Sequence, residues 1–560
     1  MKRFLQPCLA ALALAGCGEQ PGTSGSGPSA ESADLVIRNA RIWTGIPAAP
    51  WSSALAIRGD RIVAVGGLPE VNPQVGADTE IIDSPAGLVL PGFIDSHVHL
   101  LSSGFELSSI QLRDAQSPEE FVRRIGEFSA NLAPGTWIEG GTWDHQNWGG
   151  ELPHRDWIDP VTADRPVFVT RLDGHMALAN SKALALAGID RDTPDVEGGE
   201  IVRDASGEPT GILKDNAMER VLRVLPEPTA DQRDQALERA MDYLLAQGVT
   251  TVHTMGYDWS EWEVFRKAHD AGRLRTRIYS VVPIADWQRL AAAVESGGRG
   301  DDWLRIGGLK GFMDGSLGSH TAAFFEPFED APDDRGLFVT PPAQMREWAL
   351  AADAAGLQLL IHAIGDRANA ELLDIFAAAA EGNGPRDRRF RIEHAQHLRP
   401  SEIGQIAALG IIPSMQPYHA ADDGRWADGV IGAERSRYTY AFRSLLDAGA
   451  TPAFGSDWSV APASPVLGIH AAVTRQTLDG AHPDGWVPEE KISVEEALVA
   501  YTRTGAYASF DERRKGSLAP GLLADLVILD RDITSIPVDE IRDARVVRTL
   551  VGGRTLYRRD

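Results

Sequence analysis

Residues 87–100, GLVLPGFIDSHVHL, form an apolar run that ends in two histidines separated by one residue. Side chains alternate between the two faces of a β-strand, so His97 and His99 lie on the same face. Two imidazoles on one face can bind a single metal ion. A lone His-x-His pair is weak evidence for a metal site, because such pairs also occur on solvent-facing strands. Here the apolar run predicts a buried strand, where unpaired polar groups are costly, and this favours a metal site.

Four further polar residues stand at the ends of apolar runs. They are Lys310 in GLKGFMD, His362 in LQLLIHAIGD, His394 in RFRIEHAQ and Asp457 in TPAFGSDW. Each is a poor choice for a buried position unless it is paired or bound to metal. The intervals of 52 and 32 residues between the first three can each hold one strand–helix unit, and the last interval of 63 residues can hold two. We therefore expect all six side chains to meet at one site.

The middle of the chain alternates apolar strands with helical stretches rich in Ala, Leu, Glu and Arg. This alternation predicts an α/β fold, a (β/α)₈ TIM barrel over residues 91–515, with parallel strands and crossover helices. Catalytic side chains in such barrels lie at the carboxyl ends of the strands. The candidate strands are GFIDSHVHL, PVFVTRL, GVTTVHTM, GLKGFMD, LQLLIHAI, RFRIEHAQ, GIIPSMQ and ATPAFGSDW.

Two regions depart from the barrel rhythm. The 211 residues between His99 and Lys310 exceed what three strand–helix units need, which predicts an α/β insertion after the first barrel strand, at about residues 105–245. Residues 34–90 and 516–560 hold short alternating apolar runs separated by glycine turns. These β-rich ends predict one small β-sandwich built from both termini.

The first residues predict export. A short positive segment and an apolar stretch predict a signal peptide over residues 1–16. The end of this stretch, LAGC, resembles a bacterial lipobox, which implies a lipid on Cys17. Gly18 follows instead of the aspartate that retains lipoproteins in the inner membrane, so we expect an outer-membrane protein facing the periplasm, with residues 17–33 as a flexible tether. Ordinary cleavage near Ala15, which would release an unanchored protein, is the alternative.

The composition of the chain limits the classes of partner that we expect it to bind. The 560 residues carry a formal net charge of -25, with 43% hydrophobic and 24% charged residues. This composition allows a large core, while the negative balance repels nucleic acid and anionic lipid heads. We expect a small-molecule substrate, no nucleic-acid partner, and membrane contact through the lipid only. The two cysteines, Cys8 and Cys17, leave no thiol or disulfide for the mature chain.

The ordered set His-x-His, Lys, His, His, Asp resembles the amidohydrolase superfamily. The local motifs PGFIDSHVHL, KGFMDGSLGSHTA, HAIGDRA, RIEHAQ and GSDW are similar to the exoenzyme-like subgroup (amidohydrolase 3 type) that includes N-substituted formamide deformylase. The similarity extends from Asp34 onward and includes DGHMALANSKAL and GGEIVRDASGEPTGILKD in the insertion. These motifs are specific for the family, but they do not identify a substrate.

The resemblance implies a role for each residue. His97 and His99 would bind a first divalent metal together with Asp457, and His362 and His394 would bind a second. Lys310 would bridge both ions as a carboxylated lysine, because a protonated lysine beside two dications would be strongly repelled. A neutral lysine beside a single metal is the alternative. Zinc is the expected metal, as one or two ions.

The implied chemistry is hydrolysis of a carbon–nitrogen bond in an amide, formamide, cyclic amide or carbamate by a metal-activated hydroxide. Asp457 would be the catalytic residue that takes a proton and passes it to the leaving nitrogen. Ester or lactone hydrolysis uses the same site and stays open. Deamination is disfavoured by Lys310, which single-metal deaminases of the superfamily lack. A periplasmic binding protein without turnover is the alternative from another class.

Several residues are candidates for the substrate pocket. His145 and His175 lie in insertion motifs of the subgroup, and the tryptophans Trp143, Trp148, Trp426 and Trp458 could form an apolar wall. Of these we single out Trp143, His145, His175 and Trp458. His320, His397 and His419 lie near the predicted barrel mouth, and the sequence assigns them no role. The sequence also leaves open whether the protein forms a homodimer.

Overall fold

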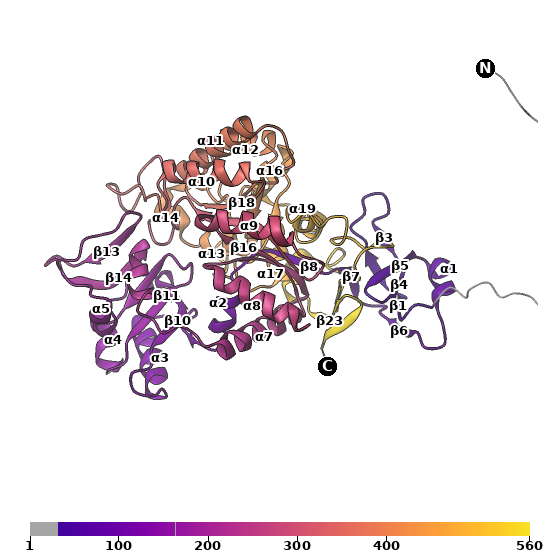
Figure 1. The fold of residues 1–560 in the computed structure, drawn as a ribbon, viewed down its shortest axis with the longest axis horizontal. Coiled ribbons are helices and arrows are strands. Elements are labelled where there is room, and N and C mark those ends of the chain that lie inside the picture. The colour runs from indigo at the N-terminus through magenta and orange to yellow at the C-terminus, as the bar shows by residue number, and fades with distance from the viewer. Residues whose placement is uncertain (1–31, 163, 560) are drawn as a thin grey trace, which may run out of the picture.

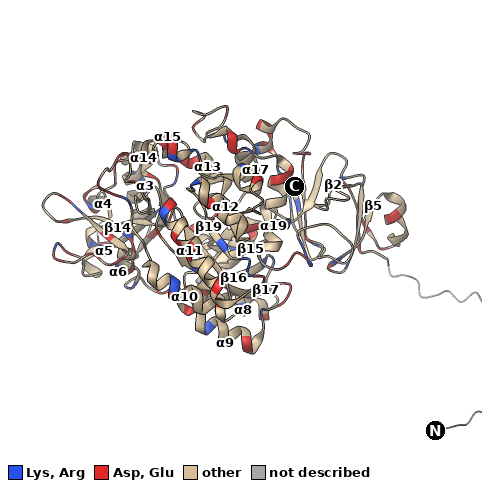
Figure 2. Ribbon diagram, turned by 90° about the horizontal axis from the view of Figure 1, so that it is seen from above, with Lys and Arg blue, Asp and Glu red and all other residues tan. Residues whose placement is uncertain are grey.

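The chain forms three parts in a row, with a β-sandwich at one end, a barrel in the middle and an insertion at the other end (Figure 1). The computed structural model describes residues 32–162 and 164–559. The predicted signal peptide and lipidated Cys17 lie outside the described residues. No helix within these ranges combines the length and apolarity needed to cross a membrane. Acidic and basic residues are spread over all three parts (Figure 2).

The middle part confirms the predicted TIM barrel. Its sheet is parallel throughout, and its eight strands neighbour one another in chain order. A parallel bridge between Val98 and Trp458 joins the end of the first strand to the segment after the last and closes the barrel. The strands are β8 (Phe93–Val98), β15 (Val249–Met255), β16 (Arg277–Pro283), β17 (Leu304–Phe312), β18 (Gln358–Ala363), β19 (Arg391–His394), β20 (Ile412–Met415) and β21 (Ala453–Phe454).

One predicted strand lies elsewhere, and one barrel strand is absent from the predicted set. The segment PVFVTRL forms β11 (Val167–Arg171), which belongs to the insertion. The third barrel strand is instead β16, in which Arg277 and Ser280 interrupt the apolar pattern. Both polar side chains are buried, and Arg277 is neutralised by Asp525. A partner 248 residues away therefore makes this strand acceptable to the core.

Helices surround the barrel and bury their apolar faces against its strands. Leu237, Ala240, Met241 and Leu244 of α7, for example, belong to the main core. The helices are α2 (Leu100–Glu106), α7 (Ala230–Ala246), α8 (Trp259–Asp270), α9 (Trp287–Gly297), α10 (Pro342–Ala354), α11 (Asp366–Asn383), α12 (Pro400–Ala408), α13 (Pro417–Asp423), α14 (Ala427–Ile431), α15 (Ala433–Ser436), α16 (Phe442–Asp447), α17 (Pro465–Thr474), α18 (Val494–Ala500) and α19 (Arg503–Ala508).

The insertion is a six-stranded mixed sheet with its own apolar cores. Its strands are β9 (Ile110–Gln111), β10 (Ile138–Trp143), β11, β12 (Met176–Ala179), β13 (Gly199–Arg203) and β14 (Pro209–Asp215), and its helices are α3 (Pro118–Ala130), α4 (Arg155–Thr162), α5 (Ser181–Leu186) and α6 (Glu219–Leu222). Because α7 packs on α2 and β15, the barrel resumes at Ala230, before the predicted boundary near residue 245.

Two sheets form the β-sandwich. One contains β5 (Arg61–Gly66), β4 (Ala54–Arg58), β1 (Leu35–Arg38) and β6 (Glu80–Asp83). The other draws on both ends of the chain and contains β24 (Arg554–Arg558), β23 (Val546–Val551), β22 (Leu526–Leu529), β7 (Leu88–Pro91), β2 (Arg41–Trp43) and β3 (Trp51–Ser52). Leu35, Ile57, Val89, Leu526 and Leu550 pack between the sheets.

A buried ion pair joins the sandwich to the barrel. The Arg277 guanidinium donates from Nε to Oδ2 of Asp525 at 2.7 Å and from Nη2 to Oδ1 at 2.9 Å. The backbone N–H of Gly552 also donates to Oδ1 of Asp525, at 2.8 Å. This bidentate geometry compensates the cost of burying both charges.

Removing one member of this pair should destabilise the protein strongly. We expect Asp525→Ala to lower the free energy of unfolding by about 3–5 kcal/mol, because Arg277 would keep its charge without a partner. The control is Asp83→Ala, which breaks an exposed pair with Arg38 and should cost less than about 1 kcal/mol. Urea unfolding of both variants measures the difference. Equal losses would contradict a linking role for the buried pair.

Candidate metal centre

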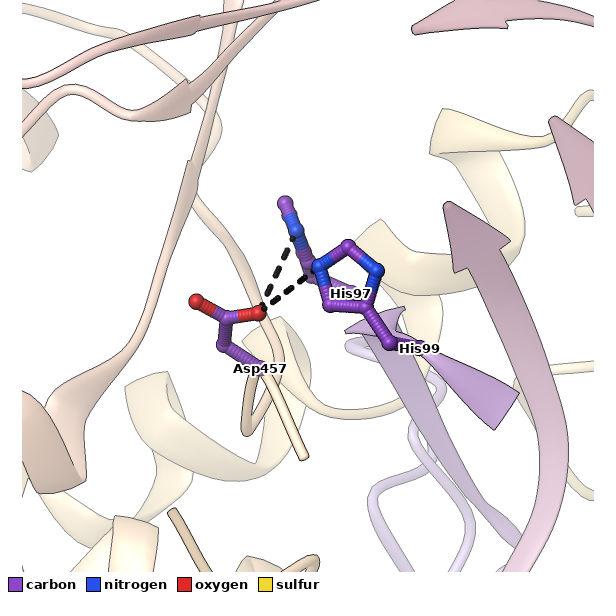
Figure 3. Close-up of side chains that lie close together, drawn as sticks. All are labelled: His97, His99 and Asp457. Carbon is purple, nitrogen blue, oxygen red and sulfur yellow. Dashed lines mark ion pairs between the residues drawn. The ribbon is translucent and has the colours of Figure 1, made fainter. Parts of the chain in front are cut away.

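His97, His99 and Asp457 converge at the mouth of the barrel (Figure 3). Oδ1 of Asp457 lies 3.5 Å from Nε2 of His97 and 3.4 Å from Nε2 of His99. Two backbone hydrogen bonds hold this arrangement, from the N–H of Asp457 to the carbonyl of His97 at 2.7 Å and from the N–H of His99 to the carbonyl of Trp458 at 2.8 Å. The carboxylate is thus fixed between the two imidazoles.

Both imidazoles turn Nε2 toward this carboxylate. Nδ1 of His97 lies 2.6 Å from Oε2 of Glu393, and Nδ1 of His99 donates to the carbonyl of Met255 at 2.9 Å. Each Nε2 is then free to bind a cation. Oδ1 of Asp457 is buried and has no hydrogen-bond donor within the described ranges. Two imidazole nitrogens and a carboxylate oxygen without a donor fit a divalent metal.

A buried arginine supports the Glu393 carboxylate. Nε of Arg391 lies 2.8 Å from Oε1 of Glu393, and Nη1 of Arg391 lies 2.8 Å from Nδ1 of His253. Burial alone would raise the pKa of Glu393, but the charge of Arg391 and the contact with His97 hold it well below its usual range. Glu393 therefore stays ionised and orients His97, as carboxylates behind metal-binding histidines do. His253 has a structural role as a neutral acceptor.

Asp95 anchors the loop that bears Asp457. Its carboxylate accepts hydrogen bonds from the backbone N–H of Ser456 at 2.8 Å and from the Ser456 hydroxyl at 2.5 Å. The neighbouring Gly455 allows this close approach, because a Cβ there would lie 2.5 Å from the backbone nitrogen of His97. Burial raises the pKa of Asp95 to about 7.

The other three predicted ligands lie next to this triplet. Nζ of Lys310 is 3.4 Å from Nε2 of His97, and the His394 ring centroid lies 4.9 Å from that of His97 and 4.5 Å from that of His362. His362 donates from Nε2 to the carbonyl of Gly315 at 3.0 Å, which leaves Nδ1 as its ligating nitrogen. The structure therefore brings all six predicted side chains together.

Burial controls protonation in this group. It lowers the pKa of Lys310 to about 8 and the pKa values of His362 and His394 well below their usual range. Neutral imidazoles suit metal binding, and a neutral amine is the form of lysine that can react with carbon dioxide.

Backbone strain is concentrated at the same place. Asp457, His394 and Ala395 have φ angles of 57°, 73° and 44°, in the left-handed region that residues other than glycine rarely adopt. Such strain clusters at functional sites, where the surrounding structure holds a side chain in position.

A cavity opens over Asp457, His362 and His394. Its wall comes from the insertion, from the loop after β17 and from the segment around α13. The lining residues are Asp144, Arg171, Leu172, Asp173, His175, Ser316, Leu317, Gly318, His362, Ile364, His394, Gln396, His419, Asp422, Asp423, Trp426, Asp457 and Val460. The insertion thus supplies one side of the candidate substrate pocket.

The four singled-out pocket residues have different surroundings. His175 lines the cavity, and its Nδ1 lies 2.6 Å from Oδ1 of Asp215. His145 is buried behind the lining and accepts from Nε of Arg171 at 3.2 Å. Trp143 is fully buried in the insertion core, and Trp458 stacks on Tyr243 with ring centroids 4.7 Å apart. Packing, rather than the cavity, thus accounts for both tryptophans, whereas Trp426 does line it.

Several residues of the site are not among the six predicted ligands or the four singled-out pocket residues. Glu393, Arg391 and Asp95 are charged side chains inside strands whose other residues are buried, and that pattern was the available signal. His419 lies with His394 and Asp457 in a second group of closely spaced ligand atoms. Its position after the seventh strand is the corresponding signal in the sequence.

Comparisons with known proteins agree with this geometry. A model of the Amidohydrolase family matches residues 80–557. Protein LONG AFTER FAR-RED 3 of Arabidopsis thaliana is 41% identical over 542 residues, which cover 95% of this chain and 92% of the relative. N-substituted formamide deformylase of Arthrobacter pascens is 29% identical, with coverage of 94% and 98%.

Solved structures include a similar enzyme. The crystal structure of an uncharacterized metal-dependent hydrolase from Pyrococcus horikoshii OT3 is 29% identical, with a TM-score of 0.73, and the match covers 90% of this chain and 99% of that one. The fold, the group of metal-binding side chains and the family match agree. The chain is an enzyme that belongs to the amidohydrolase family of metal-dependent hydrolases.

Proposed function

We propose that this enzyme hydrolyses a carbon–nitrogen bond in a small amide, formamide, cyclic amide or carbamate. The observation that carries the proposal is the carboxylate of Asp457, fixed beside two imidazoles, with Oδ1 buried and without a donor. The relative that acts as an N-substituted formamide deformylase supports the choice of bond. Zinc is the preferred metal for the imidazole and carboxylate donors.

Each residue of the site has a separate role in the proposed reaction. A bound divalent metal would lower the pKa of a water molecule and polarise the substrate carbonyl. His97 and His99 would hold it, with Glu393 and the carbonyl of Met255 fixing the orientation of the two rings. Asp457 would accept a proton from the attacking water and deliver it to the leaving nitrogen. The insertion and the loop after β17 would surround the substrate.

Lys310 determines whether the site holds one metal or two. Its amine lies 3.4 Å from Nε2 of His97 and 4.7 Å from the centroid of the Phe312 ring. Carboxylation would convert it into an anion with two oxygens, able to bridge two ions held by the histidines. A neutral amine would leave a single-metal site.

A substrate screen tests the proposed reaction. Purified, zinc-supplemented protein should hydrolyse members of a panel of formamides, N-acyl amines, cyclic amides and carbamates, with product amines measured by mass spectrometry. Turnover only of matched esters and lactones would identify an esterase instead, and release of ammonia only from amino-substituted heterocycles would identify a deaminase. Metal binding without any turnover would favour a binding protein and would reject the proposal.

Asp457→Asn should fold and lose almost all turnover. An amide cannot accept the proton, so we expect kcat to fall by about 10²–10⁴-fold. Circular dichroism checks that the variant is folded. The control is Asp479→Asn, at an exposed position, which should keep wild-type kcat. Asp457→Asn with wild-type kcat would refute the proposed role.

Chemical rescue tests the state of Lys310. If the lysine is carboxylated, Lys310→Ala should lose activity and one metal equivalent, and added formate or acetate should restore part of both. The small carboxylate would supply the missing oxygens, whereas it should not rescue His394→Ala. Metal analysis by mass spectrometry gives the stoichiometry. An active wild type with one ion and no rescue of Lys310→Ala would instead support the neutral amine.

A further inference from the structure

His419 stands beside the metal centre without any role in the family's set of ligands. It lies on α13, directly after β20, the seventh barrel strand, which contributes none of the six predicted ligands. Its ring lines the cavity, and a ring nitrogen lies within 4.8 Å of ligand atoms on His394 and Asp457. His419 thus faces the place where the reacting group must sit.

The His419 imidazole is buried in part and unsatisfied. Its Nε2 is buried and has no hydrogen-bond partner among the residues described. Leaving a buried polar atom unpaired is unfavourable, so native proteins explain such atoms by a ligand, an ion or a functional role. Because the residue lines the cavity, a bound substrate is a natural partner for its ring.

The surroundings hold His419 in place. The backbone N–H of His419 donates to the carbonyl of Gln416 at 3.1 Å, and the Gln416 side chain accepts from Nδ1 of His394 at 2.9 Å. At the other end of α13, Asp422 pairs with Arg113 of the insertion at 3.2 Å. The backbone that carries the ring is therefore held relative to His394 before any ligand binds.

Several polar side chains of the cavity wall are hydrogen-bonded to one another. Arg171 donates to His145, Asp144 and Asp173 through its three nitrogens. The hydroxyl of Ser316 donates to Asp173, and the amide of Gln396 donates to Asp423. Nδ1 of His175 is bonded to Asp215, and although burial alone would lower the pKa of His175, this carboxylate raises it above its usual value. Among the imidazoles that line the cavity, apart from His362 and His394, His419 is the one whose ring makes no hydrogen bond within the described residues.

We infer that His419 is a catalytic residue that donates a hydrogen bond to the substrate oxygen that becomes negatively charged when the carbonyl is attacked. This inference rests on the proposed function and adds a seventh residue to it. Asp457 handles the proton of the attacking water, and His419 stabilises the opposite charge change on the carbonyl oxygen. A fixed donor of this kind is worth more in the transition state than in the bound substrate.

The test compares His419→Ala, His419→Gln and a matched control. His470→Gln is the control, because His470 is also buried with an unpartnered Nε2 but lies on α17, outside the cavity lining. With the substrate found by the screen, His419→Ala should lower kcat by about 10²–10³-fold, with little change in KM. His419→Gln, which keeps an N–H donor, should recover part of this loss, and His470→Gln should match wild type.

A second measurement does not depend on turnover. Acetohydroxamate, a small anionic probe, is titrated into each zinc-loaded variant by calorimetry, and zinc content is measured in parallel. His419→Ala should bind the probe about tenfold more weakly than wild type, as expected for loss of one hydrogen bond to a charged group, and should retain the wild-type zinc content.

The outcomes separate this inference from the proposed function. If no carbon–nitrogen substrate is found, the proposed function fails, and probe binding still decides the role of His419. Loss of zinc in His419→Ala would make the residue a metal ligand and overturn the inference. Unchanged kcat and probe affinity, or a wild type that binds no probe and turns over no substrate, would overturn it as well.

Discussion

Two backbone hydrogen bonds between the first barrel strand and the segment after the eighth are the contact on which the rest depends. They connect Asp457 to His97 and His99 to Trp458, where the sheet closes on itself. Closure of the barrel and assembly of the metal-binding triplet are therefore a single structural event. The positive φ of Asp457 is unfavourable for a residue other than glycine, and the surrounding hydrogen bonds hold the backbone in this conformation.

The barrel interior next to this closure contains buried charged side chains that are paired with one another. Burial of any one of these charges alone would be unfavourable. Arg391 neutralises Glu393, and Glu393 fixes the ring of His97. The orientation of the ligand is thus set by the barrel interior and not by the loops above it. The cavity walls, drawn here from the insertion and α13, are thus built by other segments than those that orient His97.

Local sequence patterns were enough to predict the barrel and the meeting of six candidate ligands, because each of these side chains follows a buried apolar run. They failed for β16, whose Arg277 is made acceptable by Asp525, far along the chain. Trp143 was misleading because a tryptophan that packs in a core and one that lines a pocket look alike in a sequence. Glu393 is adjacent to His394, but its function depends on His97, 296 residues away. Long-range pairing was the information that the patterns lacked.

The composite sandwich has a consequence for how the chain reaches this state. In its larger sheet, β7 pairs with β22, so residues 88–91 remain without one neighbour until residues 526–529 have been made. The first barrel strand continues directly from β7, within the same apolar run. During synthesis this segment therefore lacks one strand partner until β22 has emerged. Completion of the fold is thereby coupled to arrival of the carboxyl terminus, and a prematurely ended chain would expose an unpaired, aggregation-prone strand edge.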